Sequence, residues 1–412
     1  MTLTVLTDDE IRSLLENLTP EDLEGFSEAL ASALHEYSAA RQDGRGSDTS
    51  IHQPERIVVH SAATGATTLF MPSCNSAGNA VKVITLTTAA AAAASTPTKT
   101  GDEPQQHQTK KVIRPTGAIT LFDPAGAPLG LLHAATLTAF RTALASLAMV
   151  VRRQFTSGTL VVFGRGGQAY WHVRLALLAR GPEVRRVVFV GRRRRRTGVE
   201  AGAEGSGSGS GLLARFTEGV PLEVREREGW ADCEFEELTG EDEGYASGLA
   251  GVLREADVVF CCTPSSAQLF DASTLLKSGS DKGWLIVAIG SYTPEMREVP
   301  GDLIKRAITP GGGKREAGVV VVDTIEGALK EAGELIEVGV KPEQLVELGE
   351  LLEPKGAGDK ATDKKRGNLL GWLETGNVIY KSVGTGLMDL SIGMHLIEFA
   401  KQKGVGTHVQ GF

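Results

Sequence analysis

Residues 159–178, TLVVFGRGGQAYWHVRLALL, place a glycine-rich turn between an apolar run and a helical pattern. Apolar runs continue to alternate with helical segments along the chain, as RRVVFVG, DVVFCCTP, GWLIVAIG and AGVVVVD. Strands that are apolar along their whole length are typical of a parallel sheet covered by helices on both faces. The centre of the chain is therefore predicted to be an α/β domain built on a buried parallel sheet.

The first third of the chain has a different pattern. Two amphipathic helices are expected at the start, with Thr7 and Thr19 as their N-caps. Short β-branched runs follow, RIVVHS, ATTLFMP and NAVKVITL, and GAITLFDPAGAPLGLLHA has the pattern of a hairpin. These segments predict an antiparallel sheet. At the other end of the chain, NVIYKSVGTGLMDLSIGMHLIEFAKQKG predicts a strand, a glycine turn and a closing helix.

Composition narrows the classes of protein. The 412 residues are enough for two domains, and the apolar share of 41% with 23% charged residues is typical of a globular protein. The formal net charge of −8 argues against a dedicated nucleic-acid binder. Three stretches are expected to be surface insertions: AAAAAASTPTKTGDEPQQHQTKK, residues 200–211 and residues 353–367.

The cysteines and the N-terminus indicate a location. Cys74, Cys233, Cys261 and Cys262 are too few and too irregularly spaced for a disulfide framework, which favours a reducing compartment. No metal-ligand spacing is present, so no metal is expected. Acidic residues within the first ten argue against a signal peptide, and the apolar runs are too short for a membrane span. We expect a cytoplasmic protein.

The glycine turn has the G-x-G-x-x-A spacing, with Gly164, Gly166 and Ala169 at the defined positions. The first glycine permits the tight turn, and the second lets the backbone approach a pyrophosphate. Gly167, Gln168 and Ala169 open the following helix, whose first N–H groups can bind phosphate. The turn is thus predicted to bind a dinucleotide. The alternative is a purely structural turn.

Five consecutive arginines, Arg192–Arg196, follow the next apolar run, which ends at Val190. A site for NAD usually places an acid at this strand end to bind the ribose 2′-hydroxyl, whereas the first acid here is Glu200. Arginine binds a 2′-phosphate with charge-assisted hydrogen bonds. Arg192 and Arg193, nearest the strand, are therefore predicted to bind the 2′-phosphate of NADP. The alternatives are solvated surface charge and a nucleic-acid contact.

With these motifs in place, the chain resembles the ornithine cyclodeaminase/mu-crystallin family. The resemblance rests on RIVVH, LFMP and AVKVITL, on HAATLTAFRTALAS, on VVFGRGGQA, and on VAIGSYTPEMREV, VVVDTIEGALKEAGEL and YKSVGTGLMDL. It implies a central Rossmann domain inserted in a split α+β substrate and dimerisation domain. The expected bounds are 141–344 for the Rossmann domain, with 1–140 plus 345–412 forming the split domain of a homodimer.

The resemblance also implies site residues. Arg56, Lys82 and Arg141 match positions that bind the substrate carboxylate or face the reacting carbon, and Met71 matches a pocket position. Arg56 and Lys82 are expected on neighbouring strands, with Arg141 at the start of the helix that leads into the Rossmann domain. A lysine beside two arginines is expected to have a lowered pKa and to transfer a proton near neutral pH. Thr263, in CCTPSS, is expected to approach the cofactor.

The sequence departs from the cyclodeaminases at two positions. Tyr292 stands where those enzymes have an aspartate that handles the amine, and Leu69 replaces a second acid. The ketimine-reductase branch also lacks the aspartate. The resemblance therefore implies an NADPH-dependent oxidoreductase that reduces the C=N bond of small imino acids, with Tyr292 in the substrate site. Two alternatives remain: a divergent cyclodeaminase-type lyase with bound NAD, and a non-catalytic binder of NADPH and a small ligand.

The arginine hypothesis makes a testable prediction. Replacing Arg192 and Arg193 with alanine is expected to weaken NADPH binding by at least roughly tenfold, since about 1.4 kcal/mol corresponds to a factor of ten. NADH lacks the 2′-phosphate, so its dissociation constant is expected to change little. Replacing Arg195 and Arg196 instead is the matched control. Equal affinity of the unmodified protein for both cofactors would contradict the prediction.

Overall fold

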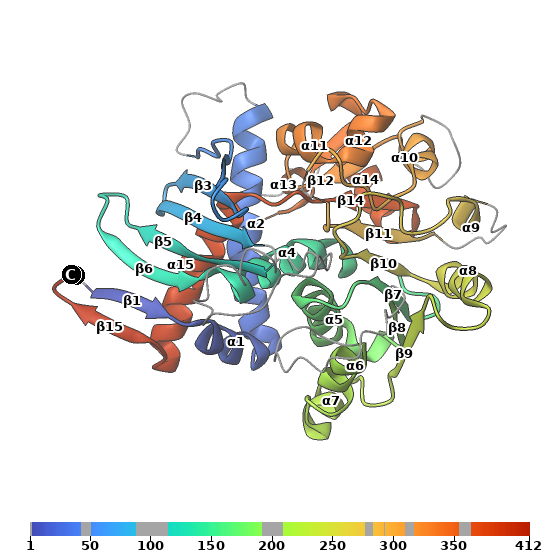
Figure 1. The fold of residues 1–412 in the computed structure, drawn as a ribbon, viewed down its shortest axis with the longest axis horizontal. Helices are drawn as coiled ribbons and strands as arrows, with labels where there is room; N and C mark the ends of the chain where they lie inside the picture. The colour runs from blue at the N-terminus through green and yellow to red at the C-terminus, as the bar shows by residue number, and fades with distance from the viewer. Residues whose placement is uncertain are drawn as a thin grey trace, which may run out of the picture. The chain divides into compact units, whose positions relative to one another are not determined.

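The computed structural model describes residues 2–42, 51–87, 114–191, 209–276, 283–291, 293–309, 317–353 and 364–412. The chain divides into two compact units, coloured by sequence position in Figure 1. Unit 1 consists of Met1–Leu18, Ala40–Thr138 and Thr385–Phe412, and unit 2 consists of Thr19–Ala39 and Ala139–Gly384. The chain thus enters unit 2 from unit 1 and returns to it, which is the inserted arrangement that the sequence predicts.

Unit 1 is built on a seven-stranded mixed sheet in the order β15-β1-β6-β5-β4-β3-β2. Its strands are β1 (Thr2–Leu6), β2 (Ile57–His60), β3 (Thr67–Asn75), β4 (Gly78–Thr87), β5 (Arg114–Phe122), β6 (Pro128–His133) and β15 (Thr407–Gln410). Strands β2 to β6 form the predicted antiparallel meander, and β5 and β6 form the predicted hairpin. Strand β1 was not expected. It pairs with β15 from the opposite end of the chain, a contact that no local pattern reveals (Figure 1).

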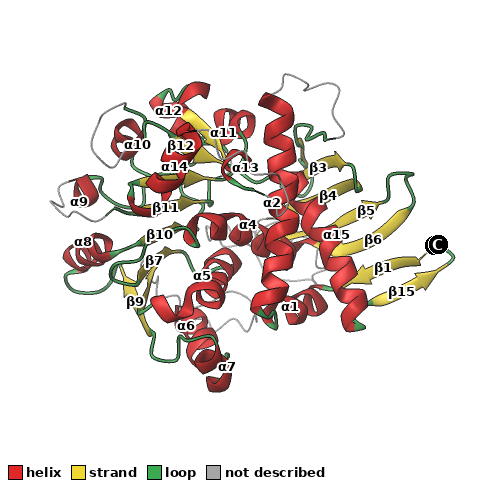
Figure 2. Ribbon diagram, turned by 180° about the vertical axis from the view of Figure 1, so that it is seen from behind, coloured by secondary structure: helices red, strands yellow, loops and turns green. Residues whose placement is uncertain are grey.

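The helices of unit 1 include α1 (Asp8–Glu16) and α15 (Gly386–Lys403). The capping box predicted for α1 is present, because the Thr7 side chain accepts from the Glu10 N–H and the Glu10 carboxylate accepts from the Thr7 N–H. Helix α15 packs along β3, β4 and β5 (Figure 2). Contact is close there: a Cβ added to Gly393 would lie 3.0 Å from the Leu121 side chain. The closing helix therefore forms the core of unit 1 with the sheet.

Unit 2 contains an eight-stranded, all-parallel sheet in the order β13-β12-β14-β11-β10-β7-β8-β9. Its strands are β7 (Thr159–Phe163), β8 (Arg186–Gly191), β9 (Glu234–Thr239), β10 (Val258–Cys261), β11 (Leu285–Ala288), β12 (Val320–Val322), β13 (Leu345–Glu347) and β14 (Val378–Lys381). Every residue of β7, β10, β11 and β14 is buried, so both faces are covered. The sequence prediction of a buried parallel sheet is confirmed.

The order β9-β8-β7-β10-β11 is the 3-2-1-4-5 order of the doubly wound dinucleotide fold. The order reverses between β7 and β10, and ligands bind such folds at the carboxyl ends of the strands beside this switch point. The turn that carries Gly164 follows β7, and Thr263 lies just beyond β10. Both predicted cofactor segments thus lie at the switch point.

Helices connect and cover these strands. They are α2 (Pro20–Gln42), α4 (Ala134–Val150), α5 (Gly167–Arg180), α6 (Gly209–Thr217), α7 (Leu222–Arg227), α8 (Tyr245–Glu255), α9 (Ser273–Leu276), α10 (Gly301–Ala307), α11 (Ile325–Glu331), α12 (Gly333–Val338), α13 (Leu348–Leu351) and α14 (Lys364–Thr375). Within the described residues, none is both long enough and apolar enough to cross a bilayer. Residues 88–113, which include the first expected insertion, and most of the other two expected insertions lie outside the described residues.

Two segments differ from the expected domain bounds. Strand β14 was expected in the split domain, but it pairs between β11 and β12 in the parallel sheet, so only the residues from Thr385 onward belong to unit 1. Most of α2 belongs to unit 2, where Phe26 packs edge-on against Phe140, with ring centroids 5.3 Å apart. The sequence pattern identified both elements correctly, but pairing partners far along the chain decide which unit contains them.

A buried carboxylate joins two strands of unit 2 at their amino ends. Asp257 accepts hydrogen bonds from the backbone N–H groups of residues 156–159, at 2.7–3.2 Å. Asp257→Ala is expected to lower the free energy of unfolding by about 2–4 kcal/mol, because it leaves these donors without an acceptor. Denaturant unfolding measures the effect. Asp302→Ala, at an exposed helix end, is the control and is expected to change stability by less than about 0.5 kcal/mol.

Candidate active site

The turn after β7 brings two strand ends into close contact. Gly164 has φ +122°, and a Cβ there would lie 2.9 Å from the Cys262 carbonyl oxygen and 3.2 Å from Thr263 Oγ1. Any other residue would push the loops after β7 and β10 apart. Gly164 and Thr263, both predicted from the sequence to contact the cofactor, are therefore brought together within unit 2.

The start of α5 is open and lacks a side-chain cap. Gly166 is the N-cap without a capping hydrogen bond, and a Cβ on it would meet nothing within 4 Å. Gly167 is also exposed, whereas Ala169 is fully buried against the sheet. Gln168 Oε1 is buried without a hydrogen-bond partner among the described residues. N–H donors at the start of a helix and an open approach fit the pyrophosphate of a dinucleotide.

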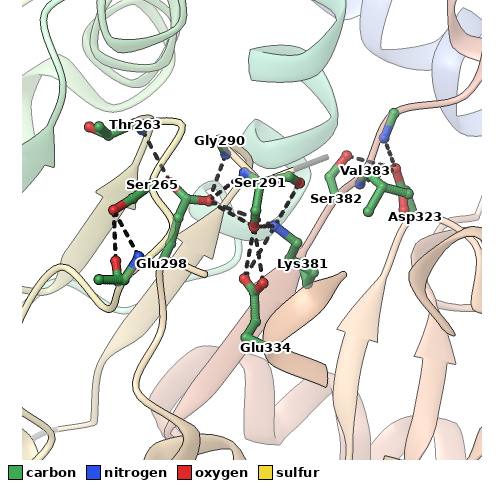
Figure 3. A network of polar contacts seen from close by, with 12 residues as sticks. Thr263, Ser265, Gly290, Ser291, Glu298, Asp323, Glu334, Lys381, Ser382 and Val383 are labelled. Carbon is green, nitrogen blue, oxygen red and sulfur yellow. Dashed lines mark hydrogen bonds and ion pairs between the residues drawn. The ribbon is translucent and has the colours of Figure 1, made fainter. Parts of the chain in front are cut away.

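Glu298 holds the loops that follow β10 and β11. Its fully buried carboxylate accepts hydrogen bonds from the backbone N–H groups of Thr263 (3.1 Å), Gly290 (2.7 Å) and Ser291 (3.0 Å), as Figure 3 shows. These loops lie at the carboxyl ends of their strands, on the side where doubly wound folds bind ligands. Glu298 thus fixes the position of the Thr263 backbone.

A lysine and a second carboxylate complete this network. Lys381, the last residue of β14, lies 3.3 Å from Glu334 Oε1 and 3.7 Å from Glu298 Oε2. It also donates to the Ser291 carbonyl at 3.1 Å, and the Ser291 hydroxyl donates to Glu334 (Figure 3). The Lys381 amine therefore faces two buried carboxyl groups. Burial raises the pKa of Glu298 to about 7, helped by the charge of Glu334 and opposed by Lys381 and the backbone donors.

Asp323 shapes the turn after β14. Its carboxylate accepts from the Ser382 hydroxyl at 2.7 Å and from the N–H groups of Val383 (3.0 Å) and Gly384 (2.6 Å). Gly384 has φ +83°, and a Cβ there would lie 3.1 Å from both terminal nitrogens of Arg141. The Arg141 guanidinium is thus buried against this turn. Arg141 was expected at the start of its helix, but it lies in the middle of α4.

Lys82 of unit 1 has a partner that the sequence analysis missed. The Lys82 Nζ lies 2.7 Å from Asp389 Oδ2, and the two side chains are only 2% and 1% exposed. Lys82 projects from β4, and Asp389 lies in the first turn of α15, where the helix dipole favours a carboxylate. An acid at hydrogen-bond distance from this lysine was not expected from the sequence. The signal was present as the lone acid in GTGLMDLS.

Met71 and Arg56 are placed differently around this lysine. Met71 is buried and lies directly opposite Lys82 in the β3–β4 register, so the two share one face of the sheet. Arg56 is half-buried and precedes β2. The expectation that Arg56 and Lys82 occupy neighbouring strands is wrong, because β3 lies between β2 and β4. Leu69, which replaces the second acid, packs in a small apolar cluster with Met71 and Ile84.

Three predicted site residues, Arg192, Arg193 and Tyr292, lie outside the described residues. The structure also brings forward acids and a lysine that the sequence analysis did not single out, namely Glu298, Asp323, Glu334, Lys381 and Asp389. Asp323 follows β12 and Lys381 ends β14, whereas Glu334 and Asp389 lie in the first turns of α12 and α15. Position in the sequence did not distinguish them from surface charges.

Unit 2 is therefore a dinucleotide-binding fold, and unit 1 carries a buried lysine–aspartate pair. No protein-family model matches the chain. A Delta(1)-pyrroline-2-carboxylate reductase of Bacillus cereus is 26% identical over 316 residues, which cover 74% of this chain and 78% of the relative. The uncharacterized protein YGL159W of Saccharomyces cerevisiae is 26% identical over 304 residues, covering 68% and 73%.

Solved structures share the fold along the whole chain. Delta(1)-pyrroline-2-carboxylate reductase of Thermococcus litoralis, in complex with NADH and L-proline, superposes with a TM-score of 0.62 at 19% identity, covering 99% of this chain and 100% of that one. The iminosuccinate reductase of Paracoccus denitrificans, in complex with NAD+, gives 0.63 at 20% identity, covering 100% and 99%. A probable ornithine cyclodeaminase of Bordetella pertussis gives 0.62 at 21% identity, covering 98% of each chain.

These matches bear out the resemblance to the ornithine cyclodeaminase/mu-crystallin family that the sequence elements indicate.

The raised pKa of Glu298 predicts a pH dependence of stability. The folded protein holds this proton up to about pH 7, whereas the unfolded chain releases it near the usual value of 4.5. Stability from this group is therefore present below about pH 4.5 and is lost as the pH rises to about 7. Relative to Glu298→Gln, the unmodified protein is expected to lose up to about 1.4 kcal/mol per pH unit in this window.

Denaturant unfolding at pH 5, 6 and 7 measures this difference. Any constant offset from the amide substitution cancels, because the slope against pH is compared rather than the absolute value. Glu326→Gln on the exposed face of α11 is the control. Parallel profiles for the unmodified protein and Glu298→Gln would show that the carboxylate is ionised throughout.

Proposed function

We propose that the protein is an NADPH-dependent oxidoreductase that reduces the C=N bond of small imino acids, cyclic ketimines among them. The observation that carries this proposal is the buried Lys82–Asp389 pair. Reduction of a C=N bond adds a hydride to carbon and a proton to nitrogen, so the protein must supply one proton for each hydride. A lysine withdrawn from water and held at a fixed position by a carboxylate is suited to deliver it.

The nicotinamide cofactor supplies the hydride when bound. In unit 2 the open N-terminus of α5, with Gly166, Gly167 and Gln168, would hold its pyrophosphate. Gly164 and Thr263 would approach its ribose or nicotinamide, and Glu298 keeps the Thr263 backbone in place. The role of this unit is orientation and charge stabilisation.

The remaining residues are assigned to the substrate. Arg56 and Arg141 bind its carboxylate, because a guanidinium offers two parallel donors to a carboxylate. Met71, opposite Lys82, lines the space for the carbon skeleton, and Tyr292 takes the position where cyclodeaminases have an acid. After hydride transfer, Lys82 gives its proton to the nitrogen, and Asp389 stabilises the positive charge on the lysine before this step.

The relatives support the reaction class. The chain covers more than two thirds of the Bacillus cereus Delta(1)-pyrroline-2-carboxylate reductase, and its fold is shared with reductases solved with NADH or NAD+. The absence of the cyclodeaminase acids at Leu69 and Tyr292 favours reduction over deamination. NADPH is preferred over NADH in this proposal, because β8 ends in Gly191 without an acid.

We assign the protein to the cytoplasm and to a homodimer. All four cysteines are free thiols, in accordance with a reducing compartment. An archaeal alanine dehydrogenase with the same fold, at a TM-score of 0.62, is described as a dimer with bound NAD. Edge strand β2 of unit 1 exposes Ile57, Val58 and Val59, an apolar surface that suits contact with a second copy.

A direct assay tests the proposal. Purified protein is mixed with NADPH and Delta(1)-pyrroline-2-carboxylate, and NADPH absorbance and product are followed together. Reduction predicts one NADPH oxidised for each substrate molecule reduced to proline. A lyase would instead convert ornithine and release ammonia without net cofactor consumption, and a non-catalytic binder would bind NADPH without turnover. Either outcome would overturn the proposal.

Lys82→Met tests the proton donor. Turnover is expected to fall by roughly a hundredfold or more, the scale of general acid catalysis, while the NADPH dissociation constant stays nearly unchanged. Because this change leaves Asp389 buried without its cation, the double variant Lys82→Met with Asp389→Asn is measured as well. It is expected to recover stability but not turnover. Lys401→Met, exposed on α15, is the control. Lost cofactor binding with intact turnover would assign Lys82 to the wrong site.

A further inference from the structure

Arg165 belongs to the glycine turn after β7, and its side chain reaches the end of the neighbouring strand β8. Arg165 stands between Gly164 and Gly166, and its guanidinium lies against Gly191, the last residue of β8. A Cβ added to Gly191 would lie 2.1 Å from Arg165 Nη2 and 2.3 Å from its Cζ. The guanidinium therefore covers the strand end at the position that a side chain of residue 191 would occupy.

The guanidinium is held there by an acid from the next strand. Glu237 of β9 forms an ion pair with Arg165 Nη2, and the two side chains are 17% and 21% exposed. Glu237 is paired in register with Phe189 of β8, two residues before Gly191. The pair therefore lies at the carboxyl ends of β8 and β9, and both side chains keep part of their surface exposed there.

In doubly wound folds, the end of this strand contacts the cofactor. β8 is the second strand of the 3-2-1-4-5 order, and the end of that strand is where the fold contacts the ribose hydroxyls of the adenosine. An acid there favours NAD, whereas an arginine accommodates a 2′-phosphate. In this chain the strand-end residue is a glycine, and a guanidinium from the pyrophosphate-binding turn fills its place.

We propose that Arg165 determines cofactor specificity by binding the ribose 2′-phosphate, with Glu237 holding its guanidinium in position until the phosphate arrives. The inference rests on the proposed function, in that the protein must bind a nicotinamide dinucleotide. A guanidinium presents five donors, so it can bind phosphate along one edge while another edge stays near the carboxylate. The Glu237 charge repels a phosphate at the same point and therefore weakens the binding that Arg165 provides.

An ordinary surface ion pair on the same two strands serves as the comparison. Arg186, at the amino end of β8, pairs with Glu236 of β9 at 2.7 Å. It has the same residue types, and its glutamate also lies on β9, but its arginine belongs to β8 and the pair lies at the end of the sheet away from the glycine turn. Arg186→Ala is therefore a matched control.

Binding of four ligands to the full chain tests the proposal: NADPH, NADH, and the fragments 2′,5′-ADP and 5′-ADP, measured by calorimetry. Arg165→Ala is expected to raise the dissociation constants of NADPH and 2′,5′-ADP by at least roughly tenfold, or about 1.4 kcal/mol. The dissociation constants of NADH and 5′-ADP are expected to change by less than about threefold. Arg186→Ala is expected to change none of the four. The fragments carry no nicotinamide, so this readout does not depend on turnover.

Two more variants keep the test decisive if Arg165→Ala does not fold. Gly191→Ala leaves the arginine in the chain but places a methyl group where its guanidinium lies, and it is expected to weaken 2′,5′-ADP selectively. Glu237→Gln removes the competing charge and is expected to tighten 2′,5′-ADP and NADPH severalfold.

Three results separate the hypotheses. If Arg165→Ala weakened the binding of all four ligands equally, the proposal would be overturned, and the role of Arg165 would be to support the glycine turn. Selective loss of NADH binding in Glu237→Gln would also overturn the proposal, because Glu237 would then be the acceptor for the ribose hydroxyl. An unmodified protein that binds neither NADPH nor NADH would instead overturn the proposed function.

Discussion

The buried carboxylate of Glu298 is the interaction on which the cofactor side of this structure depends. Loops at the carboxyl ends of parallel strands have no neighbouring strand to accept their N–H groups, so an acceptor must come from elsewhere in the chain. Glu298 supplies it to the loops after both β10 and β11, and Lys381 links this acid to Glu334 and Ser291. The close approach of Gly164 to Thr263 requires that the Thr263 loop does not move.

The buried ion pair in unit 1 needs a separate explanation. A buried ion pair contributes little net stability, because removing both charges from water costs about as much as their attraction returns. Lys82 and Asp389 are nevertheless almost completely buried. Because such a pair is costly to bury and contributes little stability, a chemical role explains it better than folding does, in accordance with the proton delivery proposed for Lys82.

One short stretch of chain serves both units. Residues 381–389 contain Lys381, which completes the Glu298 network of unit 2, and Asp389, which pairs with Lys82 in unit 1. Between them, Asp323 fixes the turn at Ser382–Gly384 against which Arg141 is buried. The segment YKSVGTGLMDL therefore carries several buried polar contacts, although the sequence alone indicated only a strand, a turn and a helix start.

The sequence by itself determined the two kinds of sheet, the glycine turn and the identity of the buried lysine. These features follow from hydrophobic periodicity, from the backbone freedom of glycine and from the cost of burying charge, which are local properties of a segment. Only the tertiary structure decided that β14 joins the parallel sheet, that Asp389 faces Lys82, and that Arg165 fills the place of a side chain at Gly191. Each of these depends on residues far apart in the chain, and an isolated acid or arginine in an apolar segment has the same pattern whether it meets water, a counter-ion or a cofactor.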